Sequence, residues 1–388
     1  MHICFLTLDF PPYRSSGLTV YAEQVVKGLA ARGHTVTVVA AERVGRTQVE
    51  PPYHLENVSV VRVPIGATDW IGFGWQAARY LRANRGNFDV VHFADVHFAY
   101  AYSGTFIASA FQSFRQRLTS HHGRPYHTNW RNYLFRLSYY SFARWFMEQP
   151  SVNRAKHVVM PSASTQEEFI EHYHVARSRT TLVYLGIDTQ RFDTMPTQAE
   201  ARRKLNFPMD CKILLYIGFS TPRKGLEYLA QAMEIVTTPV ELVMVGKWEA
   251  NYQDRFLKAL QHQQSHVRIE GYVPDTMLLD YFAASDIFVF PTLLEGFGIP
   301  LVEAMAAGLV VVTTTAGSAS EIIGDAGVSV PPGDSVALAK ALDTVLTAPD
   351  LVRSLGKRGK VRARALFDEH RAITELEALY EAVLGNHN

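Results

Sequence analysis

Two glutamates stand eight positions apart in the run PTLLEGFGIPLVEAMAAG, residues 291–308. Glu295 lies in the glycine-containing loop 296–298, and Glu303 lies on the first turn of a helix that we expect to begin at Pro300. Glycines let a backbone approach a ligand closely, and the amides of a helix N-terminus attract hydroxyl oxygens or negative charge. Since carboxylates accept hydroxyl hydrogen bonds, the pattern indicates a polyhydroxylated ligand. The alternative is a strand-to-helix turn whose acidic residue only serves the helix dipole.

Short β-branched runs alternate with helical patterns along the chain, which is typical of an α/β fold with parallel, doubly wound sheets. In the first half, the strand-like runs are HICFLTL, HTVTVVA, VSVVRV and FDVVHF, and residues 17–33 have helical periodicity. The rhythm restarts in the second half, with strands expected at 211–218, 239–246, 266–272, 286–291 and 309–315. Turn formers gather at 185–200, so we place a domain boundary near residue 190.

The composition limits the classes of protein that fit. A chain of 388 residues with 47% hydrophobic residues can bury two cores, and a net charge of +1 predicts no nucleic-acid partner. Two cysteines exclude a disulfide framework, and the N-terminus lacks the features of a signal peptide, so we expect a cytoplasmic protein. The longest uncharged stretch, 96–114, is diluted by polar residues and does not predict a membrane span.

The motifs resemble the retaining glycosyltransferases of family 4, which have the GT-B fold of two facing Rossmann-like domains. EGFGIPLVE matches the Glu-x7-Glu run of that family, and PPYRSSGLTVYAEQVVKGLAARGHTVTVV resembles its N-terminal glycine loop, helix and second strand. VYLGIDTQRF resembles the segment that joins the domains, and FDEHRAITELEALYEAVL resembles the C-terminal helix that crosses back. The resemblance implies an acceptor-binding domain at 1–190, a donor-binding domain at 191–366, and a helix at 367–388 that packs on the first domain.

The resemblance assigns the acidic loop and helix to a nucleotide-sugar donor. By matching position, Glu303 is expected to bind the ribose hydroxyls. Glu295 is expected to hold the donor sugar together with Gly296, Phe297 and Gly298.

GFSTPRKG (218–225) resembles the diphosphate-binding segment of the family and implies that Gly218 lies at the donor, with Lys224 and Arg223 as the catalytic cations. A cation beside the departing diphosphate stabilises the developing charge. Many relatives carry an arginine where this chain has Phe219, so either Arg223 substitutes for it or donor binding is weaker or reshaped.

The N-terminal loop and a histidine pair are also matched. The amide of Gly17 is expected to approach the diphosphate, and Ser16 stands on the acceptor side, where the family usually has a second glycine. RLTSHHGRP (117–125) resembles the site of a family histidine near the donor sugar; alignment selects His122 as the catalytic candidate, with His121 beside it on the acceptor side. A histidine pair at a strand end is equally compatible with a structural role or half a metal site, but no third ligand has zinc spacing, so we predict no metal.

Two further matches concern the nucleotide. GYVPD resembles a loop whose backbone faces the base, so Tyr272 and Val273 are expected to flank it. Glu321, in AGSASEII, matches a family glutamate near the donor, although glutamates at helix starts are common for electrostatic reasons.

The reaction implied by the resemblance is transfer of a sugar from a nucleotide donor, with a UDP-sugar favoured, to a hydroxyl of a sugar, lipid or small-molecule acceptor. Retaining hydrolases use two carboxyls that flank the anomeric carbon. With Glu303 on the ribose and Glu295 on the outer hydroxyls, no enzyme nucleophile is evident, so we expect front-face substitution. We expect no resident cofactor or metal.

Three other classes of protein share parts of this pattern. One is a nucleotide-sugar epimerase on the same fold, and another is a catalytically silent nucleotide-sugar-binding subunit, which Phe219 and Ser16 permit. The third, a dinucleotide oxidoreductase, needs a G-x-G-x-x-G turn after the first strand, and DFPPYRSSG is not one.

One segment is basic and aromatic. Residues 96–147 contain six arginines and four histidines but no Asp or Glu, and aromatic residues are interleaved from Tyr126 to Phe146. The favoured interpretation is an amphipathic helix at about 130–147 with most of its aromatic side chains packed inward and its arginines in water. The alternative is peripheral contact of residues 115–145 with an anionic membrane, at the inner membrane face.

Overall fold

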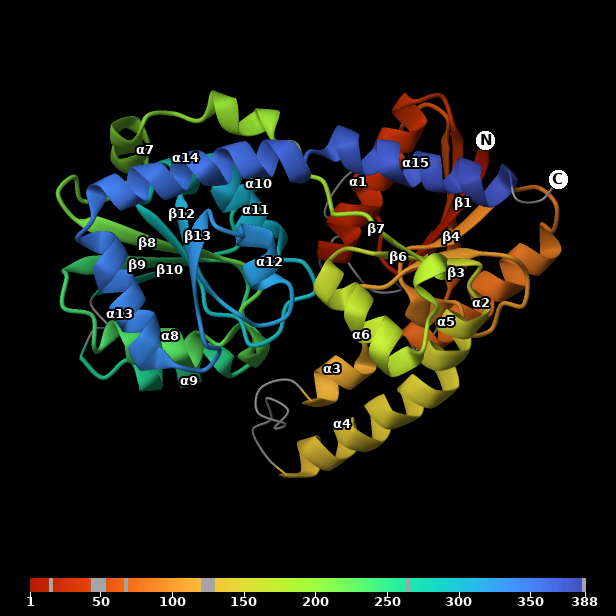
Figure 1. The fold of residues 1–388 in the computed structure, drawn as a ribbon, viewed down its shortest axis with the longest axis horizontal. Helices are drawn as coiled ribbons and strands as arrows, with labels where there is room; N and C mark the ends of the chain where they lie inside the picture. The colour runs from red at the N-terminus through yellow and green to blue at the C-terminus, as the bar shows by residue number, and fades with distance from the viewer. Residues whose placement is uncertain (14–16, 43–53, 66–68, 120–129, 263–265, 386–388) are drawn as a thin grey trace. The chain divides into compact units, whose positions relative to one another are not determined.

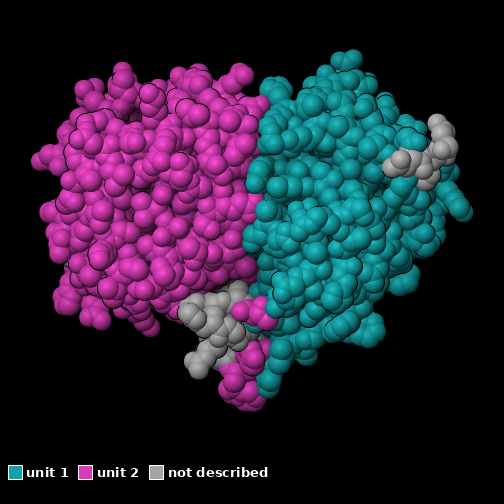
Figure 2. Space-filling model, viewed as in Figure 1, with its two compact units in different colours: residues 1–118, 134–186, 369–388 teal, residues 119–133, 187–368 magenta. Residues whose placement is uncertain are grey.

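The computed structural model describes residues 1–13, 17–42, 54–65, 69–119, 130–262 and 266–385. The chain divides into two compact units, which Figure 2 shows in different colours. Unit 1 comprises residues 1–118, 134–186 and 369–388, and unit 2 comprises residues 119–133 and 187–368. The C-terminal segment is therefore part of unit 1.

Unit 1 contains a seven-stranded sheet in which all neighbouring strands are parallel. Its spatial order is β3 (Val58–Pro64), β2 (Thr35–Glu42), β1 (His2–Thr7), β4 (Val90–Phe93), β5 (Ile107–Ser109), β6 (His157–Met160) and β7 (Thr180–Leu182). The central strands are continuous apolar runs because both faces of a parallel sheet are covered. The strand order reverses between β1 and β4, which is the usual position of a binding crevice in such sheets.

The helices of unit 1 include the C-terminal one. In chain order they are α1 (Gly17–Ala31), α2 (Asp69–Ala83), η2 (Val96–Phe98), α3 (Phe114–Thr119), α4 (Trp130–Ala143), the π-helical turn η3 (Arg144–Glu148), α5 (Gln149–Arg154), α6 (Ala163–Tyr173), η4 (Arg177–Arg179) and α15 (Glu369–Gly385). The first four residues of α4 are grouped with unit 2. α15 packs on α1, where Arg32 forms an ion pair with Glu377 at 2.6 Å between Nη1 and Oε2.

Unit 2 contains a six-stranded parallel sheet. Its order is β10 (Val267–Gly271), β9 (Val240–Val245), β8 (Lys212–Ile217), β11 (Ile287–Phe290), β12 (Val310–Thr314) and β13 (Gly327–Val330). The helical segments are η5 (Gln190–Thr194), α7 (Gln198–Leu205), η6 (Pro222–Lys224), α8 (Leu226–Met233), α9 (Tyr252–Ala259), α10 (Asp275–Ala284), α11 (Ile299–Ala306), α12 (Ala319–Ile323), α13 (Ser335–Leu346) and α14 (Pro349–Leu366). In Figure 1, α8, α9 and α13 lie on one side of the strands, and α7, α10 and α14 lie on the other.

Both units are therefore Rossmann-like α/β structures, and the predicted fold class is confirmed. Each strand predicted in the second half is present to within a residue or two at either end. Among the helices of the described ranges, none is both long enough and apolar enough to cross a bilayer.

The favoured interpretation of the basic aromatic segment is wrong for α4 and η3. The helix forms where predicted, but Trp130, Phe135, Phe142, Trp145 and Phe146 are each more than half exposed. The side that packs inward contains smaller or more flexible residues, including the buried residues Ala143 and Met147.

Candidate functional site

The loop that carries Glu295 follows β11 at the carboxyl end of the sheet of unit 2. Ser318, which is fully buried, binds this loop twice: its amide donates to the Glu295 carbonyl at 3.1 Å and its hydroxyl donates to the Phe297 carbonyl at 3.0 Å. Gly317 adopts φ +59°, and a Cβ there would lie 2.1 Å from the Glu295 carbonyl oxygen. Only glycine permits this close approach, so the segment 317–318 fixes the backbone of the acidic loop.

The segment that carries Lys224 and Arg223 lies against the same loop. The amide of Leu293 donates to the Arg223 carbonyl at 2.8 Å, and Arg223 Nη1 donates to the Leu294 carbonyl at 2.6 Å. Gly225, at φ +66°, ends η6, and a Cβ there would lie 2.2 Å from the main-chain oxygen of residue 291. Two segments 71 residues apart in the sequence are thus bound together through their main chains.

Lys224, Arg223 and Glu295 form a charged cluster. Lys224 Nζ lies 2.5 Å from Glu295 Oε2 and 4.4 Å from the centroid of the Phe290 ring, and Arg223 Nη1 lies 3.5 Å from the same Glu295 oxygen. Burial, together with repulsion from Arg223, lowers the pKa of Lys224 to about 8, although Glu295 opposes the shift. Burial alone would raise the pKa of Glu295, but the two cations outweigh it and hold that pKa below its usual value.

Glu303 is the fifth residue of α11, one residue further into the helix than we predicted. Its interpretation as an acidic first-turn residue that serves the helix dipole is therefore wrong. Its carboxylate accepts a hydrogen bond from the guanidinium of Arg191, a residue of η5. Burial raises the pKa of Glu303, Arg191 opposes that shift, and the nearby charge of Asp275 adds to it.

The loop between β10 and α10 approaches Glu303 through Asp275, which is the first residue of α10. Tyr272 in this loop is 63% exposed and its ring lies 5.0 Å from Lys247 Nζ, whereas Val273 is buried. Gly218 follows β8, close to the Tyr216 ring that stacks on Phe290. The structure therefore brings the predicted base-side loop and the predicted diphosphate segment into the same unit as the two glutamates.

Other predicted residues lie elsewhere or outside the described ranges. Glu321 stands in the first turn of α12, three residues after Ser318, and its main-chain carbonyl accepts a hydrogen bond from Arg362. Gly17 is the first residue of α1 in unit 1 and is exposed. Three candidates are not among the described residues, namely Ser16, His121 and His122.

Two functional candidates were missed from the sequence. Arg191 stands in the segment that resembles the domain connection, and Gly317 with Ser318 stands in the run that we used only for Glu321. The available signal was weak: an arginine three residues after Asp188 in one case, and a Gly-Ser pair before a helix in the other.

Across the described ranges, no group of three His, Cys, Asp or Glu side chains is arranged as metal ligands would be.

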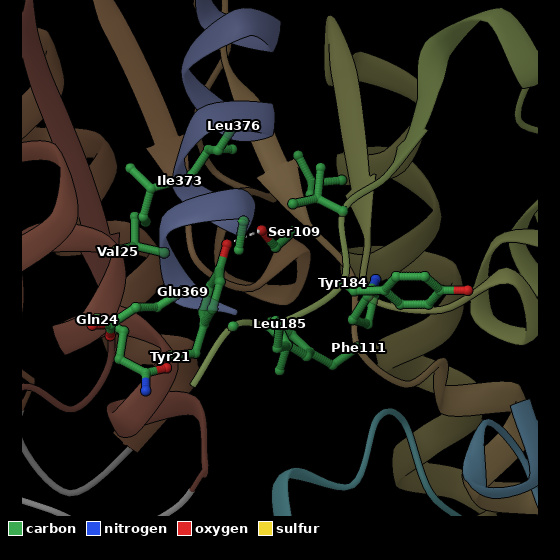
Figure 3. A pocket seen from close by; sticks show the side chains of 15 residues that line it. Tyr21, Gln24, Val25, Ser109, Phe111, Tyr184, Leu185, Glu369, Ile373 and Leu376 are labelled. Carbon is green, nitrogen blue, oxygen red and sulfur yellow. Dashed lines mark hydrogen bonds between the residues drawn. The ribbon is translucent and has the colours of Figure 1, made fainter. Parts of the chain in front are cut away.

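Unit 1 contains a separate small pocket, shown in Figure 3. Tyr21 and Ser109 share a hydrogen bond of 2.9 Å in its wall, and Ser109 in turn contacts His92 Nε2 at 2.9 Å, while His92 Nδ1 lies 2.5 Å from the Tyr380 hydroxyl. The remaining lining is mostly apolar, including Val25, Phe111, Leu185, Ile373 and Leu376. Burial lowers the pKa of His92 to about 3, so this chain of hydrogen bonds is uncharged and holds α15 on the unit.

Comparisons with known proteins match both halves of the chain. A family described as "Glycosyltransferase Family 4" matches residues 15–191, and one described as "Glycosyl transferases group 1" matches residues 197–362. The MMP alpha-(1->4)-mannosyltransferase of Mycolicibacterium hassiacum is 27% identical over 417 aligned positions, which cover 96% of this chain and 97% of that protein.

Solved structures match along the whole chain. Sucrose-phosphate synthase from Thermosynechococcus elongatus superposes with a TM-score of 0.80 at 21% identity, covering 99% of each chain. Anabaena HepE, in complex with UDP-glucose, superposes with a TM-score of 0.73 at 18% identity, covering 98% of this chain and 100% of HepE.

Two Rossmann-like units, with a Glu-x7-Glu loop and helix beside paired cations, define a glycosyltransferase with the GT-B fold. The chain belongs to the glycosyltransferases of family 4.

Proposed function

We propose that the protein transfers a hexose from a UDP-sugar to an acceptor hydroxyl with retention of anomeric configuration, and that unit 2 binds the donor. The observation that carries the proposal is the cluster of Lys224, Arg223 and Glu295. It places two cations and one carboxylate within hydrogen-bond or ion-pair distance, so it carries a net positive charge. A diphosphate can use that charge, whereas a neutral ligand cannot.

The cluster is organised before the donor arrives. The ammonium of Lys224 is nearly buried, held by Glu295 on one side and by the Phe290 ring on the other. Fixed charges in a site of low water content stabilise a developing negative charge more strongly than mobile ones, because they need not reorganise. Lys224 and Arg223 are therefore assigned to the two phosphates, and Glu295 to the lysine and the hydroxyls of the donor sugar.

The nucleoside is assigned to Glu303 on α11. Glu303 accepts from the ribose hydroxyls, while Arg191 keeps its carboxylate oriented and charged. Tyr272 and Val273 flank the base from the loop that reaches Glu303 through Asp275. The choice of uridine is supported by Anabaena HepE, whose structure holds UDP-glucose.

The reaction is proposed to be a front-face substitution. The bond between the anomeric carbon and the phosphate oxygen breaks, and a bond from the acceptor oxygen forms on the same face, which preserves configuration. The acceptor proton passes to the departing phosphate oxygen, so no protein nucleophile is required. Lys224 and Arg223 hold the phosphate charge that accumulates, and neither glutamate is left to attack carbon.

The acceptor is proposed to meet unit 1. Ser16, which precedes Gly17 in the sequence, and His121 remain the predicted residues of that side, whereas Gly17 and His122 remain predicted at the donor. Sugar, lipid and small-molecule acceptors all present the hydroxyl that the reaction needs, and the described residues favour none of them.

The test compares Lys224→Ala with Lys258→Ala, which removes an exposed lysine from α9 of the same unit. We expect UDP-sugars to raise the melting temperature more than GDP- or ADP-sugars do. We also expect kcat of the Lys224→Ala variant to fall about 100-fold or more, as it does when a preorganised hydrogen-bond donor to the transition state is removed. The Lys258→Ala variant should keep its kcat. The configuration of the product, read by NMR, must match that of the donor.

Three results would overturn the proposal. Full turnover by the Lys224→Ala variant would remove the diphosphate role, and an inverted product would exclude front-face substitution. Conversion of a labelled UDP-sugar without any acceptor would indicate an epimerase instead.

A further inference from the structure

The outer side of α4 and η3 is apolar. Beyond Trp130 at the start of α4, six further large side chains are exposed, with Phe135, Trp145 and Phe146 each at least 60% exposed. We call this set the aromatic face: Leu134, Phe135, Leu137, Phe142, Trp145 and Phe146. Their spacing places them along one side of a helix, and Figure 1 shows α4 at the edge of the molecule, away from the strands.

The aromatic face is held firmly rather than loosely attached. Glu148, at the end of η3, is fully buried and accepts hydrogen bonds from the Phe114 amide at 3.1 Å and from the Tyr173 hydroxyl, while His97 Nε2 contacts it at 2.8 Å. Burial disfavours the charged form of His97, but Asp95 and Glu148 outweigh it and raise its pKa to about 9. A charged histidine thus bridges two carboxylates and fixes the inner side of η3, which leaves the aromatic side outward.

The helix also carries positive charge that no acidic side chain neutralises. Arg131, Arg136 and Arg144 form no ion pair with any residue in the described part of the chain. Arg131 lies over the Trp130 ring at 5.5 Å. Arg144 lies between the Trp145 and Tyr173 rings, at 5.2 and 5.1 Å, and its Nη2 donates to the His172 carbonyl at 3.2 Å. Glu148, which follows this acid-free segment, is buried and fully engaged, so it does not offset the charge at the surface.

We propose that the aromatic face is a docking surface for an anionic lipid bilayer. Aromatic side chains combined with arginines suit the boundary between headgroups and acyl chains, where rings are buried and guanidinium groups remain at the phosphates. The helical segment 130–148 would lie in the plane of the membrane with its rings inserted to about 5–10 Å. At 1.5 Å per residue it is about 28 Å long, which gives a line of attachment rather than a single point.

A second copy of the chain fits this face less well. In a symmetric dimer the same patch would meet itself, and Arg131 and Arg136, which have no acidic partner among the described residues, would be brought towards their own copies. Like charges brought together across an interface repel each other, whereas an anionic surface attracts each arginine.

The test uses the full chain and sedimentation with vesicles of phosphatidylcholine, with or without phosphatidylglycerol. Phe146→Glu is compared with Val336→Glu, because the two side chains are 64% and 63% exposed and Val336 lies on α13 of unit 2. We expect binding only when the anionic lipid is present, a loss of more than ten-fold for Phe146→Glu, and no change for Val336→Glu. Arg131→Gln should weaken binding about five-fold, and added salt should weaken it further.

Several results would overturn the proposal: equal binding to neutral and anionic vesicles, no binding to either, or equal binding by the Phe146→Glu and Val336→Glu variants. A chain that is dimeric without lipid and becomes monomeric on Phe146→Glu would assign the face to a second copy. Binding of UDP-sugars, measured by melting temperature on the same samples, reports on unit 2 separately. A failure of the donor assignment therefore leaves the membrane result interpretable, and the reverse also holds.

Discussion

The lowered pKa of Lys224 predicts how donor affinity depends on pH. A diphosphate gains from Lys224 only when the amine is protonated, and burial lowers its pKa to about 8. Above that pH the free enzyme must take up a proton to bind the donor, because the bound diphosphate raises the lysine pKa again. Donor affinity is therefore greatest well below the lysine pKa and falls as the pH rises through that pKa.

The size of this pH dependence follows from the proton that Lys224 must take up when the donor binds. The amine is half protonated at its pKa, so affinity for a UDP-sugar should fall about five-fold between about pH 8 and about pH 9, and about ten-fold, or about 1.4 kcal/mol, for each further pH unit. Below about pH 7 it should be nearly constant. Isothermal titration calorimetry in buffers of different ionisation enthalpy should also record the uptake of about half a proton near pH 8.

Two variants separate Lys224 from other titrating groups. Lys224→Arg keeps a cation that stays protonated throughout this range, so its affinity should be independent of pH even if weaker. Glu295→Gln removes the carboxylate 2.5 Å from the ammonium, so the lysine pKa should fall further and the loss of affinity should begin at lower pH. A wild-type profile that is flat up to about pH 9, or one that Lys224→Arg does not change, would refute the reasoning.

Three other predictions concern stability and the second glutamate. Gly317→Ala should cost about 3 kcal/mol or more of unfolding free energy in urea, because its Cβ meets a carbonyl. Gly308→Ala, at a similar positive φ with open space, should cost only about 1–2 kcal/mol. Arg191→Ala should raise the pKa of Glu303 further, so calorimetry should show a greater loss of donor affinity at acidic than at neutral pH. His97, with its pKa raised to about 9, stabilises unit 1 fully below about pH 6.5 and loses that effect towards pH 9; His97→Gln should flatten this dependence, which is at most about 1.4 kcal/mol per pH unit.

The fold could be predicted where the sequence carries its own periodicity. A strand expected at 239–246 is β9, because a buried parallel strand is a continuous apolar run. β5 and β7, with three residues each, are too short to produce such a signal. For α4 the periodicity located the helix but not its orientation, since a helix with an apolar side can turn that side inward or outward. The orientation is set by Glu148 and its partner His97, which is 51 residues away in the sequence.

In the candidate site too, the local features could be predicted from the sequence and the long-range contacts could not. The glycine loop and helix start near Glu295 follow from local residue types, and the structure has them in that place. The contacts that give these residues their chemistry are long-range: Glu295 binds Lys224 at a separation of 71 residues, and Glu303 binds Arg191 at a separation of 112. No local pattern identifies such partners, and it was Arg191 that we missed.

The arrangement of these ion pairs explains why the cluster contains two cations. Glu295 holds Lys224 in position, but the same carboxylate cancels the lysine charge and would repel a diphosphate. Arg223 provides the surplus: its guanidinium lies 3.5 Å from that carboxylate and is anchored by the Leu294 carbonyl, so the cluster stays positive while Lys224 remains ordered. Glu295 and Arg223 thus have complementary effects, since the carboxylate positions the lysine and the arginine restores the charge that positioning removes. Because this chain has Phe219 rather than a cation in the same segment, that charge depends on Arg223.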